Sequence, residues 1–301
     1  MKASLGDKLL VYILAVVSIV LWAMSYIWSN QLIQWGIPVV YIVCIRSLVA
    51  GLVLMLFNFI AGNSIRIHKG DLPKFLMLAL CEPFIYFVCE TYGIKLTESP
   101  TYSALVIATA PLFSVAAGVM LFRERINWVN IVGIGICLLG LGIVTHGATS
   151  VGEHFVLGVV LLVIAVISEV GYASFTKALS STYKPTVIAQ YQFLFGGIML
   201  LPLFVTMGFK EYDAEIYMSW DVWRPILCLA ILCSSIAFTL WASTIKNLGV
   251  AKASIFLAMI PIVTAVIGAL LGTELLTPLQ WTGIAIAVFG LIMTQYVRKK
   301  R

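Results

Sequence analysis

Four ionisable side chains lie inside stretches that are otherwise almost entirely apolar. They are Arg46, Glu82, Glu90 and Glu169, in a chain of 301 residues that is 61% hydrophobic and only 11% charged. Apolar runs of about 20 residues, the length that crosses a bilayer, recur along the sequence. A charged side chain at the bilayer centre costs about 2.5 to 3.5 kcal/mol on insertion scales. These four residues are therefore candidates for substrate binding or ion coupling.

Depth along the apolar runs separates the four residues. At about 1.5 Å per residue, Arg46 lies about 12 Å and Glu90 about 9 Å from the same membrane face. They are placed to form either a structural ion pair or a gate or substrate contact. Glu82 and Glu169 both lie near the middle of their runs. Because eight residues turn a helix by about 80° net, Glu82 and Glu90 can face one cavity wall.

Two roles are open for the two deeper carboxyl groups. Glu82 and Glu169 bind a substrate amine or carry a coupling proton, or each is a protonated carboxyl that hydrogen-bonds to a neighbouring helix. Of the four ionisable residues, three are acidic and one is basic, and this excess of negative charge disfavours strongly anionic substrates. An amino-acid-like molecule would place its amine near Glu82 or Glu169 and its carboxylate toward Arg46.

Prolines and aromatic residues near these acids are further candidates. A proline within a helix removes a backbone donor, so it forms either a break that lines a cavity or a packed kink without a chemical role. The candidate helix breaks are Pro83, Pro111 and Pro261. An aromatic ring contacts a substrate ammonium or serves packing and lipid contact. The candidates on the acid-bearing runs or their repeat partners are Trp22, Tyr26, Tyr86 and Tyr172.

Hydropathy predicts an all-α membrane protein with ten spans. The spans are 9–28, 38–60, 72–96, 101–121, 128–145, 157–179, 186–207, 223–247, 251–271 and 278–297. The first is expected to be a retained span rather than a signal peptide, because no small-residue cleavage site follows it. Thr277 and Gln280 have the spacing of a capping box at the start of the last span.

The positive charges indicate the orientation. Fifteen lysines and arginines fall on the side that holds both termini, and only Lys95, Lys210 and Arg224 fall on the other. This predicts cytoplasmic N and C termini and an even number of spans. The formal charge of +6 is scattered between spans, which does not indicate nucleic-acid binding. The six cysteines contain no C-x-x-C pair, so neither a metal nor a cofactor is expected.

An internal repeat divides the chain. Pro111 with Pro261, Gly140 with Gly290 and four further matches stand 150 residues apart, and Arg46 with Gln192 stands 146 apart. We therefore expect two units of five spans, residues 1–146 and 147–301. Since five is odd, the second unit must cross the membrane in the opposite sense. Such inverted repeats are typical of secondary transporters that work by alternating access.

The repeated blocks also resemble a known family. "SALVIATAPLFSVAAGVMLFRERINWVNIVGIGICLLGLGIV" from Ser103 and "ASIFLAMIPIVTAVIGALLGTELLTPLQWTGIAIAVFGLIM" from Ala253 are similar to the paired EamA domains of the drug/metabolite transporter superfamily. The resemblance implies that the small residues and prolines of the fourth and ninth spans help to form a central cavity. It also implies export of amino acids, metabolites or drugs. The two acids and the proline of the third span are not required by the family pattern.

The sequence thus predicts a secondary-active transporter in a bacterial inner membrane, an exporter or exchanger of small amino-acid-like, zwitterionic or cationic metabolites. No ATP-binding motif appears, so a gradient must supply the energy, with a proton as one candidate coupling ion. The alternatives are a nucleotide-sugar or phosphate-ester antiporter, which would need more cations than Arg46, and an intramembrane enzyme using Glu82 and Glu90. Substrate identity, transport direction and the choice between monomer and homodimer stay open.

Overall fold

The part of the chain that the structure describes is helical. The computed structural model describes residues 5–110, 112–113, 128–146, 154–207, 217 and 219–294, and these contain no strand. Six helical segments among them are long and apolar enough to cross a membrane, namely Leu10–Gln34, Val39–Ile60, Lys69–Thr97, Phe155–Leu179, Pro185–Met207 and Trp220–Leu248. They coincide with the first, second, third, sixth, seventh and eighth predicted spans, which confirms an all-helical membrane protein.

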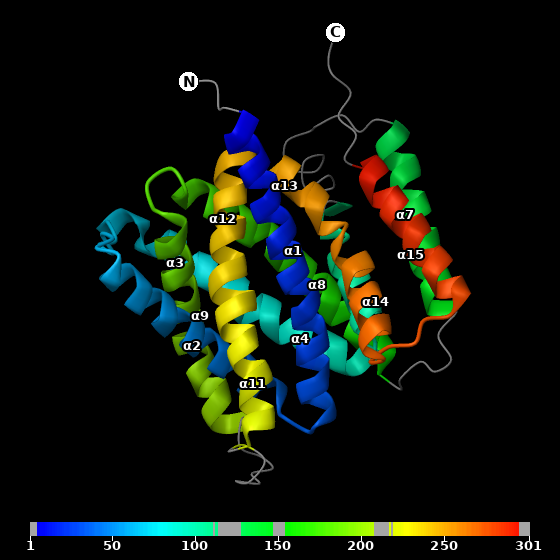
Figure 1. Cartoon of the computed structure of the whole chain (residues 1–301), viewed down its shortest axis with the longest axis horizontal. Coiled ribbons are helices and arrows are strands. Elements are labelled where there is room, and N and C mark those ends of the chain that lie inside the picture. The colour runs from blue at the N-terminus through cyan, green and yellow to red at the C-terminus, as the bar shows by residue number, and fades with distance from the viewer. Residues whose placement is uncertain are drawn as a thin grey trace.

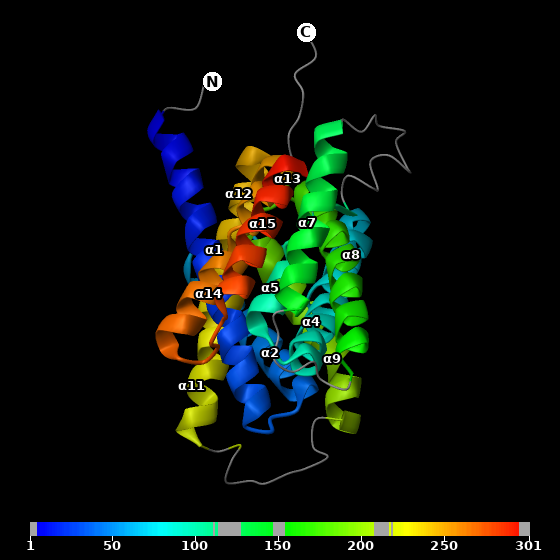
Figure 2. The ribbon, with the colours of Figure 1, turned by 90° about the vertical axis from the view of Figure 1, so that its right-hand side faces the viewer.

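Figure 1 shows the helices in chain order, from blue at the N-terminus to red at the C-terminus. The first part of the chain contains α1 (Leu5–Gln34), α2 (Val39–Ile60), η1 (Lys69–Asp71), α3 (Leu72–Ala79), η2 (Leu80–Ile85), α4 (Tyr86–Thr97), α5 (Pro100–Ile107) and α7 (Trp128–His146). The second part contains α8 (Phe155–Leu179), α9 (Pro185–Met207), α11 (Trp220–Cys228), η3 (Leu229–Ile236), α12 (Ala237–Leu248), α13 (Val250–Leu257), α14 (Ile260–Leu271) and α15 (Pro278–Thr294). The start of α1 and the end of α15 lie at the same end of the molecule (Figures 1 and 2).

Two of the long segments change winding near their middle. In Lys69–Thr97 the π-helical η2 joins α3 to α4, and in Trp220–Leu248 the π-helical η3 joins α11 to α12. At Glu82 the backbone leaves helical geometry altogether, with φ −149° and ψ 120°. This agrees with the break expected at Pro83, whereas η3 contains no proline and was not predicted. Departures of this kind inside membrane helices are frequent at functional sites.

The helices α2 and α9 pack together, each against the broken segment of the other part of the chain. Helix α2 also contacts η3, and α9 also contacts η2. Two glycines permit the close approach of α2 and α9. A Cβ atom on Gly51 would lie 2.8 Å from Leu194, and one on Gly197 would lie 2.7 Å from Leu48. Both glycine–leucine pairs are related by the predicted 146-residue offset.

The ninth predicted span is not one continuous helix. The stretch 251–271 is divided into α13 and α14, which are separated by Ala258 and Met259, and Pro261 lies in the first turn of α14. A proline is favoured at that position because its missing N–H would have no partner there. In the fourth predicted span, α5 ends at Ile107. Pro111 lies outside the described residues.

The last helix begins as its sequence predicts. The Thr277 N–H donates to Gln280 Oε1 at 2.8 Å, and the Gln280 N–H donates to Thr277 Oγ1 at 3.3 Å, which is the reciprocal capping box. Helix α15 then runs along α7, and the two form a pair at one side of the molecule (Figures 1 and 2). The pair joins the last helix of the first part of the chain to the last helix of the second.

A carboxylate links the two parts of the chain at the end opposite to the start of α1. Glu274, in the loop between α14 and α15, accepts hydrogen bonds from the Thr101 N–H at 3.1 Å and from Thr101 Oγ1 at 2.6 Å, and it also accepts one from Ser99 Oγ. Ser99 is the N-cap of α5. A carboxylate at a helix N-terminus satisfies free backbone donors and complements the helix dipole.

Substituting Glu274 by Gln is expected to lower the thermal unfolding midpoint of the protein in detergent, corresponding to a loss of about 1 to 3 kcal/mol. The amide nitrogen cannot accept from the α5 donors, and the negative charge at the helix end is lost. Glu98→Gln is the matched control, because Glu98 is exposed on the neighbouring turn. Equal midpoints for the two variants would show that the Glu274 contacts contribute nothing.

Candidate functional site

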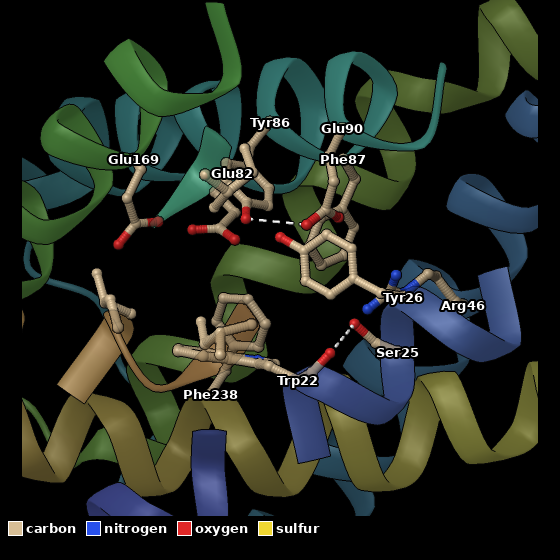
Figure 3. Close-up of a pocket in the computed structure, with 13 residues that line it drawn as sticks. Trp22, Ser25, Tyr26, Arg46, Glu82, Tyr86, Phe87, Glu90, Glu169 and Phe238 are labelled. Atoms are coloured by element: carbon tan, nitrogen blue, oxygen red, sulfur yellow. Dashed lines mark hydrogen bonds between the residues drawn. The ribbon is translucent and has the colours of Figure 1, made fainter. Parts of the chain in front are cut away.

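A cavity lies between the two parts of the chain, bordered by the broken segment η2 (Figure 3). It contains about 420 Å³ of space not filled by atoms, a volume that includes its open mouth. Its lining comes from α1, α2, η2, α4, α5, α8, α12, α13 and α14. The lining residues are Trp22, Ser25, Tyr26, Arg46, Glu82, Tyr86, Phe87, Glu90, Ile107, Glu169, Phe238, Leu257 and Ile260.

Two carboxyl groups from different parts of the chain form one end of this cavity. Glu82 comes from η2 and Glu169 from α8, and Figure 3 shows their carboxyl groups pointing toward each other. Ser168 next to Glu169 donates to the Cys81 carbonyl at 2.6 Å, so α8 is attached to the broken segment at the residue before Glu82.

Glu82 also retains unused hydrogen-bonding capacity. Its residue is 1% exposed, and its Oε2 atom is buried without a hydrogen-bond partner. The extended backbone at this position directs the side chain into the cavity rather than along a helix surface (Figure 3). A buried acceptor without a partner is costly, and a substrate amine or a proton would relieve that cost.

Arg46 forms the other end of the cavity. Its Nε and Nη2 atoms donate to Ser234 Oγ at 3.2 and 3.1 Å, and its guanidinium carbon lies 4.0 Å from the centre of the Phe87 ring. Among the described residues Arg46 has no ion-pair partner within 4 Å, so the expected pairing with Glu90 is a proximity of charges rather than a direct contact. The carboxylate of Glu90 accepts instead from Tyr86 Oη at 2.9 Å.

Aromatic rings form the wall between the two ends. Trp22 donates through Nε1 to the Cys233 carbonyl at 3.2 Å, and its ring packs edge-on against Phe238 at 5.0 Å. The Tyr26 hydroxyl is buried without a hydrogen-bond partner between the acidic end and Arg46 (Figure 3). Tyr172 does not line the cavity, contrary to the expectation for it. Its ring lies behind the wall, 5.7 Å from the ring of Phe238.

The structure thus brings together seven of the eight residues expected to bind substrate or couple its transport. Neither of the two described helix-break candidates lines the cavity. Pro83 abuts α9 at Gly196, where an added Cβ would lie 2.3 Å from its ring, and Pro261 is buried beside the lining residue Ile260. The described residues contain no cluster of three or more metal-ligating side chains.

Sequence reasoning did not identify several cavity residues. Ile107 and Leu257 end α5 and α13, and they stand 150 residues apart, so the repeat together with the helix breaks could have revealed them. Phe238 and Phe87 carry no signal of their own in an apolar sequence. The contact of Ser234 with Arg46 joins residues that are 188 positions apart and could not be foreseen.

The fold and the cavity define a helical membrane protein with a cavity lined by charged, aromatic and aliphatic residues between its helices. The sequence profile of the EamA-like transporter family matches residues 9–146 and 156–296. The chain therefore belongs to the EamA-like transporter family, and it is a membrane transporter of small molecules. This membership excludes the alternative of an intramembrane enzyme.

Relatives of known name support this assignment. The transporter YetK of Bacillus subtilis (strain 168) is 25% identical over 90% of this chain and 82% of its own length. A protein of Streptantibioticus cattleyicolor named "Probable terminal-alkyne amino-acid exporter" is 29% identical over 76% of this chain and 74% of its own. The inner membrane transporter YedA of Escherichia coli (strain K12) is 24% identical over 91% and 88%. A crystal structure with 15% identity shares the fold, with a TM-score of 0.69 over 94% of this chain and 95% of the other.

Proposed function

We propose that the protein is a secondary-active exporter or exchanger of amino-acid-like zwitterions, or of small cations, in a bacterial inner membrane. It works by alternating access between two inverted units, residues 1–146 and 147–301, with both termini in the cytoplasm. The observation that carries the substrate class is the polarity of the cavity. Glu82 and Glu169 lie at one end and Arg46 lies at the other.

The acidic end suits an ammonium group. Two carboxyl groups that face each other in a desolvated site repel when both are ionised, so they hold one proton between them or bind a cation. The aromatic faces of Trp22 and Phe238 border the same space and attract an ammonium further. A proton and a substrate amine then compete for the same pair of carboxyl groups. Such competition is required if the protein exchanges protons for substrate.

The basic end suits a carboxylate but not a phosphate ester. Among the described residues that line the cavity, Arg46 is the single cation, and Glu90 lines the same cavity. A nucleotide sugar or a phosphate ester carries more negative charge than one guanidinium can neutralise. The relative named as an amino-acid exporter agrees with the zwitterion proposal.

The test is a thermal-shift screen of the purified protein against amino acids, polyamines, nucleosides and cationic drugs, followed by uptake into proteoliposomes. We expect stabilisation by amino acids or small amines and a saturable flux that counter-substrate accelerates. Stabilisation by nucleotide sugars alone would overturn the proposed substrate class. A flux that neither saturates nor responds to counter-substrate would indicate a passive channel.

A further inference from the structure

The guanidinium of Arg46 is held in one orientation by a residue from the other part of the chain. Arg46 lies on α2 and is 1% exposed, while Ser234 lies in the π-helical η3 and is fully buried. A single oxygen, Ser234 Oγ, accepts from both Nε and Nη2. The Phe87 ring lies against the guanidinium at 4.0 Å. The plane and the rotation of the group are therefore both fixed.

This arrangement leaves one edge of the guanidinium available. Arginine has five N–H donors in a planar fork, and a carboxylate binds across two of them in parallel. Ser234 occupies the edge between Nε and Nη2, so the edge between Nη1 and Nη2 is the one that remains. The Nη1 atom is buried without a hydrogen-bond partner. Figure 3 places the guanidinium beside Tyr26 and Ser25, which line the cavity.

The nearby carboxylate does not occupy this edge. Glu90 is engaged by the Tyr86 hydroxyl at 2.9 Å and forms no ion pair with Arg46. Glu90 and Arg46 line the same cavity, so the negative charge of an ionised Glu90 offsets the positive charge of the buried guanidinium without occupying its donors. A substrate carboxylate that enters the cavity can therefore accept hydrogen bonds from Arg46, because Glu90 does not occupy the donors of the guanidinium.

We infer that Ser234 is a positioning residue for substrate selection: it turns the free edge of Arg46 toward the cavity, so that the site prefers molecules that carry a carboxylate to the matching amines that lack one. This inference rests on the proposed function, since it assigns the part of the substrate that Arg46 contacts. Without the hydroxyl, the guanidinium loses two hydrogen bonds and can rotate about its side chain. The ammonium contact at Glu82 and Glu169 is unaffected.

A purely structural role for Ser234 makes a different prediction. The neighbouring Ser235 also joins η3 to α2. The single proton of its hydroxyl is shared between the Ala50 carbonyl of α2 at 3.2 Å and the Ala230 carbonyl of its own helix at 2.9 Å. It is 2% exposed, against 0% for Ser234, and the hydrogen bonds of its hydroxyl go to these two carbonyls rather than to Arg46. Ser235→Ala is therefore a matched control that removes a serine hydrogen bond between α2 and η3 without altering the guanidinium.

The experiment measures dissociation constants for two acid–amine pairs with the purified protein in detergent. The probes are L-leucine with 3-methylbutylamine, and L-phenylalanine with 2-phenylethylamine, chosen because the wall of the cavity is aromatic and aliphatic. In Ser234→Ala we expect the affinity for the amino acids to fall about 10-fold, and that for the amines to change by less than about twofold. Ser234→Thr, which keeps the hydroxyl, should restore the preference, and Ser235→Ala should retain it.

Failure of the inference and failure of the proposed function give different results. If the wild-type protein binds the probes but Ser234→Ala weakens acid and amine equally, or Ser235→Ala has the same effect, Ser234 is structural and the inference is wrong. If the wild-type protein binds neither the amino acids nor the amines, the proposed substrate class is wrong and the inference falls with it. Unfolding midpoints of all variants identify any that fail to fold.

Discussion

Replacing Glu82 with glutamine is expected to reduce uptake of an amine-bearing substrate into proteoliposomes by about 30-fold or more, because a buried charge pair that loses one partner costs about 2 to 5 kcal/mol. Glutamine has nearly the same shape, so the broken segment η2 keeps its packing. The substrate ammonium would then face Glu169 alone, across a cavity in which Glu82 no longer carries charge. The measurement is initial uptake rate per folded transporter at several substrate concentrations.

The same substitution should remove the response of transport to pH. In the wild-type protein an acidic vesicle interior is expected to stimulate uptake. The carboxyl pair takes up a proton from the interior and releases it outside, where the substrate amine replaces it and is carried inward. Glu82→Gln removes one of the two groups that share the proton, so the imposed gradient should have little effect. Unchanged uptake together with unchanged pH dependence would refute the role of Glu82.

Glu169→Gln should resemble Glu82→Gln, and the double variant should be little worse than either single one. Residues that act through one shared contact are strongly non-additive. Glu98→Gln is the control, since Glu98 is exposed on a turn and does not line the cavity. Full additivity in the double variant would mean that the two carboxyl groups act independently.

The depth of the ionisable residues in the membrane is the feature of the site that can be predicted from the sequence. Because rise per residue is nearly constant in a helix, counting residues placed Glu82 and Glu169 at one level, and the structure brings them face to face. Depth carries no information about which neighbour a side chain faces. Arg46 was therefore assigned to Glu90, the charge at its own level, although its contacts are Ser234 and Phe87.

Helix breaks were predictable only where proline marks them. Pro83 indicated the change of winding at Glu82, but η3 has the uniformly apolar sequence LAILCSSI and gives no such signal. Hydropathy likewise merged α13 and α14 into one span, because the intervening Ala258 and Met259 are as apolar as their neighbours. Packing decides the local conformation at these places, since apolar residues suit a helix and a break between helices equally well.

The close packing of α7 with α15 predicts that two glycine-to-alanine substitutions in α7 change the stability of the protein in opposite directions. A Cβ atom on Gly140 would lie 2.4 Å from the backbone nitrogen of Ala287, whereas one on Gly142, in the same helix, would meet nothing within 4 Å. Exchanging a helical glycine for alanine normally stabilises by about 0.5 to 1 kcal/mol, because it restricts the unfolded chain. Gly142→Ala should therefore be neutral or stabilising.

Gly140→Ala should instead destabilise by about 1 to 3 kcal/mol, because the atoms in its way belong to backbone and cannot move aside without separating the helices. Gly290→Ala should behave likewise, since its Cβ would lie 2.4 Å from the nitrogen of Cys137. The measurement is the thermal midpoint of each variant in detergent. A Gly140→Ala midpoint equal to or above that of Gly142→Ala would mean that the two helices are not in this close contact. Neither helix lines the cavity, so uptake per folded molecule should stay unchanged even where the midpoint falls. That result would show that the α7–α15 pair holds the two parts of the chain together, whereas Glu82, Glu169 and Arg46 bind the substrate.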